Sequence, residues 1–125
     1  NSGRLSLPCT YDGSVLNGPD CPSMPRRTRP GSPCPDVALT DGWLLPLLGG
    51  GFTLLTINTE AQDRANLHGI ALRHLSLSAK QSPHLQARYL GDSHSAVYLI
   101  RPDQHVAARW ETYDAVAVAQ ALPLL

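Results

Sequence analysis

A short apolar hairpin near the end of the chain constrains its fold more than any other sequence feature. Two apolar segments, residues 96–100 and 106–110, flank the run Arg101-Pro102-Asp103-Gln104-His105. Proline pre-sets φ for the second position of a tight turn, and aspartate is favoured at the third. We therefore expect the chain to reverse between Arg101 and His105 and the two segments to pair antiparallel.

Regular elements are expected from Asp36 onward. Residues 37–39 predict a short edge strand, and residues 43–48 a short apolar helix interrupted by Pro46. Residues 52–57 lack polar alternation, which is typical of a strand covered on both faces. Thr59 and Gln62 form a capping-box pattern that starts a helix, which Gly69 would end.

Three further elements complete the predicted order. A strand over residues 71–77 is followed by a polar connection containing Pro83. After the hairpin comes a nearly all-apolar helix that ends at Leu122 and begins at Thr112 or Asp114, because both residues are good N-caps. A strand–helix–strand unit favours a right-handed parallel crossover, and a hairpin adds antiparallel strands. The predicted fold class is α/β, a thioredoxin-like mixed sheet flanked by helices.

The first 35 residues differ in composition from the rest. They hold seven of the eleven prolines and four of the ten glycines, without helical or strand periodicity. We interpret residues 1–35 as an irregular Pro-rich arm or linker, and residues 36–125 as the folded domain. The basic cluster Arg26-Arg27-Thr28-Arg29 is interpreted as a solvated loop, with phosphate contact as the alternative.

Composition excludes several classes of partner. The 125 residues carry ten basic and ten acidic side chains, so nothing indicates nucleic acid or an acidic membrane surface as a partner. Neither an apolar run of about 20 residues nor a secretion signal is present. Three cysteines, Cys9, Cys21 and Cys34, are an odd number that a disulfide framework does not explain. A soluble, cytoplasmic protein is expected, and the missing initiator methionine is compatible with a fragment.

The motifs that would carry cofactor or redox chemistry are misplaced or missing. Gly49-Gly50-Gly51 follows an apolar helix and precedes a strand, whereas a phosphate loop follows a strand and opens a helix. A redox thioredoxin would place Cys-x-x-Cys where this chain has residues 59–62. We therefore expect neither FAD binding nor thiol exchange by this chain.

Metal binding and acid–base catalysis are also disfavoured by spacing. The cysteines match no common zinc pattern, and the five histidines are scattered: His68, His74, His84, His94 and His105. A metal site could arise only through folding. Asp103 and His105 lie two residues apart at a turn, and turn formation explains them better than an acid–base pair. Trp43, Phe52 and Trp110 are assigned to the core or to an interface.

The amino-acid sequences of several segments resemble those of one enzyme family. Three segments resemble FAD-dependent aromatic-ring monooxygenases of the phenol hydroxylase-like and polyketide hydroxylase-like type, and they follow one another in the same order as in that family. They are the Pro-rich lead-in through Gly31 and Pro35, the run Gly50-Gly51-Phe52-Thr53-Leu54-Leu55 and the run from Leu99 to Arg109. The signature positions, which the resemblance marks as structural, are Gly51, Phe52, Leu54, Leu55, Arg101, Pro102, Asp103, His105, Val106 and Arg109. The chain departs from the family at residues 32–36 and at Ala108, where a tryptophan is common.

The resemblance implies an accessory role. In that family the matching segment is a C-terminal, thioredoxin-like appendage without catalytic, cofactor or metal residues, and the preceding FAD-binding and substrate domains carry the chemistry, with FAD and NAD(P)H. The implied contribution is stability or homodimer contacts. Part of the apolar surface of Trp110 and of the helix from Ala115 to Leu122, including Val118, is expected to be an interface, and the alternative is that these residues fill the core of the domain itself. The alternatives are a stand-alone thioredoxin-fold binding module and, less favoured, a thiol oxidoreductase.

Overall fold

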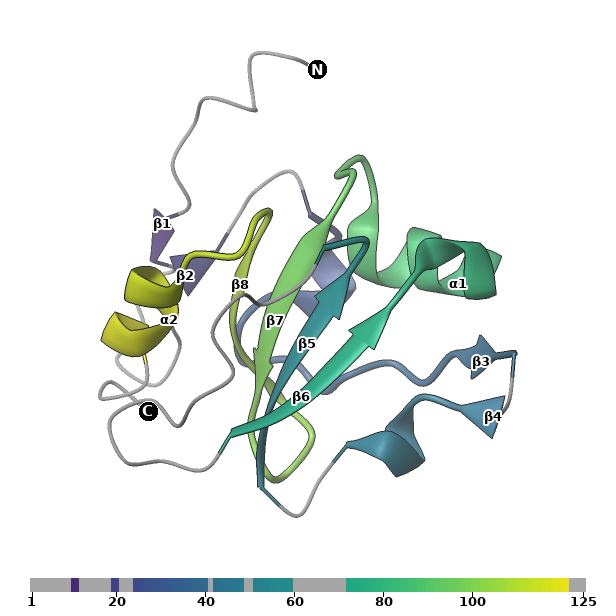
Figure 1. Ribbon diagram of the computed structural model, residues 1–125, viewed down its shortest axis with the longest axis horizontal. Coiled ribbons are helices and arrows are strands. Elements are labelled where there is room, and N and C mark those ends of the chain that lie inside the picture. The colour runs from purple at the N-terminus through teal and green to yellow at the C-terminus, as the bar shows by residue number, and fades with distance from the viewer. Residues whose placement is uncertain are drawn as a thin grey trace.

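A four-stranded mixed sheet forms the centre of the computed structural model (Figure 1). The structure describes residues 10–11, 19–20, 24–40, 42–48, 51–59 and 72–121. The strand order is β6 (Leu72–Leu77), β5 (Phe52–Ile57), β7 (Ala96–Ile100) and β8 (Val106–Trp110). β5 pairs parallel with β6 and antiparallel with β7, and β7 pairs antiparallel with β8. The predicted α/β fold with a mixed sheet is confirmed.

Apolar side chains cover both faces of this sheet, because successive residues of a strand point to opposite sides. One face contributes Leu55, Ile57, Tyr98 and Ile100 to a cluster that also contains Leu85, Tyr89 and Leu90. The other face contributes Leu54, Val97, Leu99 and Trp110 to a second cluster, which Val118 and Ala121 of α2 (Ala115–Ala121) complete. The prediction of a strand over residues 52–57, covered on both faces, is confirmed.

A helical segment stands where the sequence predicted a polar connection. The 3₁₀ turn η4 (Ala79–Gln81) leads into α1 (Pro83–Leu85), which continues as the wider π-helical turns of η5 (Gln86–Leu90). The Ser82 hydroxyl caps this helix by accepting from the backbone N–H of His84 at 3.1 Å. Apolar residues at helical spacing are buried along one side, whereas the polar residues between them face outward. The expected polar connection around Pro83 is therefore wrong.

The hairpin and the last helix form as predicted. Gln104 donates its N–H to the Arg101 carbonyl, and Arg101 donates to the carbonyl of His105, both at 2.9 Å, so the chain reverses at the Pro-Asp step. The pairing shifts register between Leu99 and Ile100. Asp114 caps α2, because its carboxylate accepts from two backbone N–H groups of the first turn, at 3.0 and 3.3 Å.

Short elements surround the sheet. β3 (Ala38–Leu39) and β4 (Gly42–Trp43) pair with each other in a small separate sheet, so residues 37–39 do not add an edge strand to the main sheet. The expected helix at 43–48 is reduced to the 3₁₀ turn η3 (Leu45–Leu47). β1 (Thr10–Tyr11) pairs with β2 (Pro19–Asp20), and η2 (Arg26–Thr28) follows. The helix expected from Thr59 to Gly69 lies outside the described residues.

Two residues expected at an interface lie in the core of the chain itself. Trp110 is 6% exposed and Val118 is fully buried, and both belong to the cluster between the sheet and α2. The prediction that these two residues offer interface surface is therefore wrong, because the inner side of α2 covers the sheet. Trp43, in contrast, is 57% exposed and does not belong to the core. None of the helices that the structure describes is long and apolar enough to cross a membrane.

Candidate functional site

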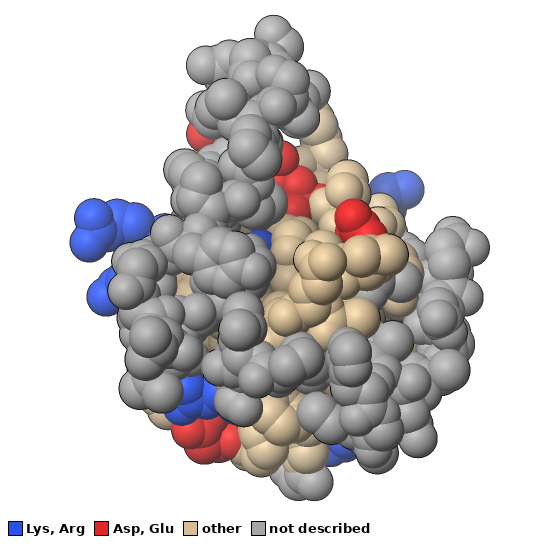
Figure 2. All heavy atoms as spheres, turned by 90° about the vertical axis from the view of Figure 1, so that its left-hand side faces the viewer, with Lys and Arg blue, Asp and Glu red and all other residues tan. Residues whose placement is uncertain are grey.

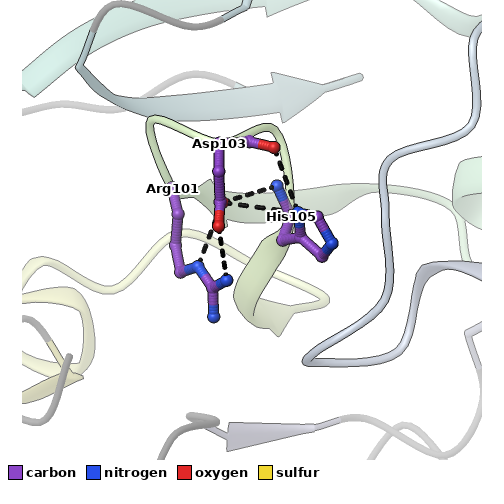
Figure 3. Close-up of polar contacts among 3 residues, drawn as sticks. All are labelled: Arg101, Asp103 and His105. Carbon is purple, nitrogen blue, oxygen red and sulfur yellow. Dashed lines mark hydrogen bonds and ion pairs between the residues drawn. The ribbon is translucent and has the colours of Figure 1, made fainter.

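The hairpin turn gathers three of the polar signature residues, Arg101, Asp103 and His105. Arg101 and His105 both point toward Asp103 from the two sides of the turn (Figure 3). The Arg101 guanidinium donates two hydrogen bonds to the Asp103 carboxylate, at 2.6 and 3.1 Å. His105 donates its backbone N–H to the same carboxylate at 3.3 Å, and its ring Nδ1 lies 3.0 Å from the Asp103 carbonyl oxygen. These contacts close the turn.

The electrostatics of this cluster suit a turn better than catalysis. The Arg101 guanidinium, through its hydrogen bonds, holds the pKa of Asp103 below its ordinary value. A carboxylate with a lowered pKa is a weaker proton acceptor, so Asp103 is a poor general base. Its side chain is also 54% exposed, and water therefore screens the ion pair. Pro102 is exposed at the tip of the turn.

Arg109, the last polar signature residue, lies in a different environment. It is 2% exposed, although an isolated charge is rarely buried. Its guanidinium donates to the backbone carbonyl of Pro25, and to the Thr28 hydroxyl at 2.9 Å. Thr28 is fully buried and its hydroxyl lies 2.7 Å from that of Tyr98. The Tyr98 hydroxyl in turn donates to the carbonyl of Tyr89 at 2.5 Å, so one chain of polar contacts joins three segments distant in sequence.

A second group of contacts extends this network toward Cys34. The Tyr89 hydroxyl donates to the Pro35 carbonyl at 2.6 Å, and the Tyr89 ring packs edge-on against Tyr98 with centroids 5.2 Å apart. Burial raises the pKa of the Cys34 thiol to about 12. A thiol with so high a pKa carries almost no thiolate at neutral pH and is a poor nucleophile. Cys34 is therefore a buried core residue, whereas Cys9 and Cys21 lie outside the described residues.

Residues 24–36, which we call the strap, pair with the end of the turn and with the first residue of β8. Gly31 donates its N–H to the Val106 carbonyl at 2.7 Å, and Val106 donates its N–H to the Ser32 carbonyl at 2.9 Å. Cys34 donates to the carbonyl of Gln104 at 2.9 Å. The signature residue Val106 is thus bonded to the strap through both of its backbone groups. The division of the chain at residue 35 remains a prediction.

Pro25 of the strap packs against the backbone turn that follows η5. Gly91 ends that helix with φ 58° and ψ −118°, and a Cβ built on it would lie 3.1 and 3.2 Å from Pro25 ring carbons. We expect Gly91→Ala to lower the free energy of unfolding by about 1–3 kcal/mol, because it adds backbone strain and displaces the proline. The control is Gly51→Ala, since no atom lies within 4 Å of the Cβ it would add. Urea denaturation of both variants checks this, and equal effects would contradict it.

The remaining signature positions belong to the sheet. Gly51 leads into β5, and Phe52, Leu54 and Leu55 alternate along it, with Leu54 and Leu55 in opposite clusters. Gly51 therefore precedes a strand, as the sequence indicated, and follows the 3₁₀ turn η3. A dinucleotide pyrophosphate binds at a glycine turn that opens a helix, whereas Gly51 opens a strand.

Metal-ligating residues form no metal site in the described part of the chain. No group of three or more His, Cys, Asp or Glu side chains gathers among the described residues. Arg26, Arg27 and Arg29 are exposed, as a solvated loop requires, but Thr28 between them is buried. Figure 2 shows the described lysines and arginines at several places on this face, most of them near its margin.

Sequence reasoning missed the residues that join the strap to the sheet. Thr28, Tyr89 and Tyr98 are buried polar residues with long-range partners that lie 9 to 81 positions away. Spacing along the sequence cannot reveal such pairs. One signal was present: Met24, Thr28 and Cys34 interrupt the prolines and arginines with side chains that suit burial, and all three are buried.

Solved structures of three flavin enzymes are similar to this fold. The structure is similar to aklavinone-11 hydroxylase in its complex with FAD and aklavinone, with a TM-score of 0.62, 22% identity and coverage of 91% of this chain and 25% of that chain. It is also similar to the flavin-dependent monooxygenase PieE, solved with FAD and substrate, with a TM-score of 0.59 and 25% identity. This match covers 99% of this chain and 25% of the PieE chain. A third match is RebC soaked with K252c, with a TM-score of 0.53 and 26% identity. This match covers 90% of this chain and 22% of the RebC chain.

No protein-family profile matches the sequence, and no curated protein matches it. The chain spans about a quarter of the length of the solved chains that it matches. At 22% identity the first match shows a shared fold, whereas the second and third extend the likeness to sequence. The resemblance seen in the sequence is confirmed: the chain is similar, over nine-tenths or more of its length, to a domain-sized part of the flavin-dependent monooxygenases.

Proposed function

We propose that this chain is the non-catalytic, thioredoxin-like C-terminal accessory domain of a cytoplasmic FAD-dependent aromatic hydroxylase. The observation that carries the proposal is the pattern of coverage, nearly all of this chain against a quarter of each monooxygenase chain. The preceding domains would bind FAD and the aromatic substrate and would use NAD(P)H and oxygen. This domain would contribute stability or dimer contacts.

The described side chains support a structural role. Signature residues Arg101 and Asp103 bond to each other, and Arg109 bonds to the strap. The strand order, with one parallel pair followed by an antiparallel hairpin, fits the thioredoxin-like arrangement. The buried Cys34, with its raised pKa, argues against thiol exchange at that residue. A free-standing binding module remains the alternative.

Exposed apolar residues support contact with other parts of such an enzyme. Trp43 at the end of β4 and Leu47 at the end of η3 are 57% and 42% exposed, while both sheet faces are already covered. Exposed aromatic side chains are enriched at protein interfaces. This side of the chain is therefore the proposed place of contact with a neighbouring domain or subunit.

A flavin titration tests the accessory role. We expect the purified 125-residue chain to give no saturable change in FAD fluorescence and no oxidation of NAD(P)H, because the turn at Gly51 precedes a strand. PieE, which has been solved with FAD, serves as the positive control under the same conditions. A one-to-one FAD complex of micromolar affinity would contradict the proposal.

The codons upstream of Asn1 test the parentage separately. A continuous reading frame that encodes a strand, a Gly-x-Gly-x-x-Gly turn and a helix would support the proposal, since that unit binds the pyrophosphate of a dinucleotide. A start codon immediately upstream would favour the free-standing binding module.

A further inference from the structure

We propose that Gln104, His105 and the first residue of β8, Val106, form a strand-binding edge that the chain fills with its own strap, residues 24–36, and that Arg109 is the positioning residue that locks the strap in place. The inference deepens the proposed function, because a locked strap would fix the point at which the polypeptide before Met24 joins this domain. The strand-binding edge and its lock rest on contacts within this chain alone.

Backbone pairing forms the strand-binding edge. An edge strand exposes unpaired N–H and C=O groups that can bind a further strand. In this chain Gly31 and Ser32 bond to both backbone groups of Val106, and Pro33 faces His105 in an antiparallel bridge. Prolines before and after Gly31 limit the conformations of the free strap, which lowers the entropy lost on docking.

Side chains fix the strap at both ends. Near its start, Met24 and Thr28 are buried, and Arg109 bonds to Pro25 and Thr28. Near its end, Arg88 donates to the Asp36 carbonyl at 3.1 Å, and the Asp36 carboxylate accepts from the Leu45 N–H at 2.9 Å. A flexible linker would not have buried side chains, nor would a buried arginine donate a hydrogen bond to its backbone. The strap therefore behaves as part of the folded unit.

Arg109 lies near the end of β8 and bonds directly to the start of the strap. The Arg109 guanidinium donates hydrogen bonds from the sheet to the strap. Without this guanidinium, the Pro25 carbonyl and the Thr28 hydroxyl lose a charged donor. Replacing a buried charged group by an apolar one of similar volume can leave the rest of a core intact. Arg109→Met should thus release the strap while β5, β6 and β7 stay paired.

Hydrogen exchange on the full chain tests the proposal, with Arg101→Met as the matched control on the same hairpin. In Arg109→Met we expect exchange at the amides of Gly31, Cys34 and Val106 to rise together by about 10- to 100-fold, the range for one lost charged hydrogen bond. The amides of Leu54 and Leu55 in β5 should exchange as in the unaltered chain. In Arg101→Met all five amides should keep their rates, since Arg101 bonds to Asp103 in the turn.

Trypsin gives an independent readout, because Arg26 and Arg27 lie in the strap with exposed side chains. Cleavage after Arg27 should accelerate in Arg109→Met by a similar factor and remain unchanged in Arg101→Met. Unchanged exchange at Gly31, Cys34 and Val106 would overturn the inference. A uniform rise that includes Leu54 and Leu55 would also overturn it, since Arg109 would then stabilise the whole domain. Neither outcome depends on whether the chain belongs to a flavin enzyme.

Discussion

Replacing Val118 with aspartate is expected to unfold the isolated chain. Val118 is fully buried in the cluster that also holds Leu54, Leu99 and Trp110, between α2 and the sheet. A carboxylate placed there would be ionised without a partner or would be forced to stay protonated, and either state costs about 4 kcal/mol or more. This loss is comparable with the whole stability of a small domain, about 5–15 kcal/mol.

Val116→Asp is the matched control, because Val116 lies two residues earlier on the same helix and is 63% exposed. That variant should stay within about 0.5 kcal/mol of the unaltered chain. Urea denaturation followed by circular dichroism measures both, and sedimentation reports association. A folded Val118→Asp chain with an unchanged midpoint and altered association would show instead that this side of α2 is an interface.

Alkaline pH is expected to destabilise the chain strongly, because three buried acidic protons are held in the folded state. Burial raises the pKa of Cys34 from its ordinary 9.0 to about 12 and that of Tyr98 from 10.0 to about 12. Burial, with the nearby Cys34, also raises the pKa of Tyr89. Above pH 9 the unfolded chain releases protons that the folded chain retains, so a rise in pH favours unfolding.

The size of the alkaline effect follows from the same linkage. The contribution of each group is complete below its unfolded pKa and is lost, at about 1.4 kcal/mol per pH unit, as the pH rises toward the folded pKa. Cys34 begins to lose its contribution near pH 9, and the two tyrosines near pH 10. Between pH 9 and 11 the three groups together should remove about 5 kcal/mol, measured by urea denaturation at each pH.

A cysteine variant separates this effect from general alkaline damage. Cys34→Ala removes one of the three groups, so its stability should fall less steeply from pH 9 to 12, by about 1.4 kcal/mol per pH unit. Tyrosine ionisation, followed by absorbance near 295 nm, should begin for Tyr89 and Tyr98 only as the chain unfolds. Equal stability at pH 8 and pH 11 would contradict the prediction.

Most of the central sheet was predictable from the sequence because its signals are local. The apolar run 52–57, the Pro-Asp turn and the Asp114 cap each lie within a few residues, and each forms the predicted element. The expected strand–helix–strand order of the segments then predicted the parallel pairing of β5 with β6. The strand bounds agree to within one residue, since turn residues mark their ends.

The helix at residues 79–90 was missed because its signals compete. Lys80, Gln81 and Gln86 make the segment polar on average, and Pro83 is typical of a connection. Proline is nevertheless compatible with the first turn of a helix, directly after the Ser82 cap. What made this segment helical was the apolar face of the sheet, against which Leu85, Tyr89 and Leu90 are buried.

The sequence alone determined the strands, the hairpin and the family likeness, because these depend on residues that are neighbours along the chain. Only the tertiary structure decided that Trp110 and Val118 are core, that Trp43 is exposed, and that Arg109 holds Pro25 and Thr28. Burial and hydrogen bonding between residues more than 80 positions apart depend on which surfaces meet when the sheet is assembled. A local pattern shows that a side chain can be buried, but the packed structure determines what buries it.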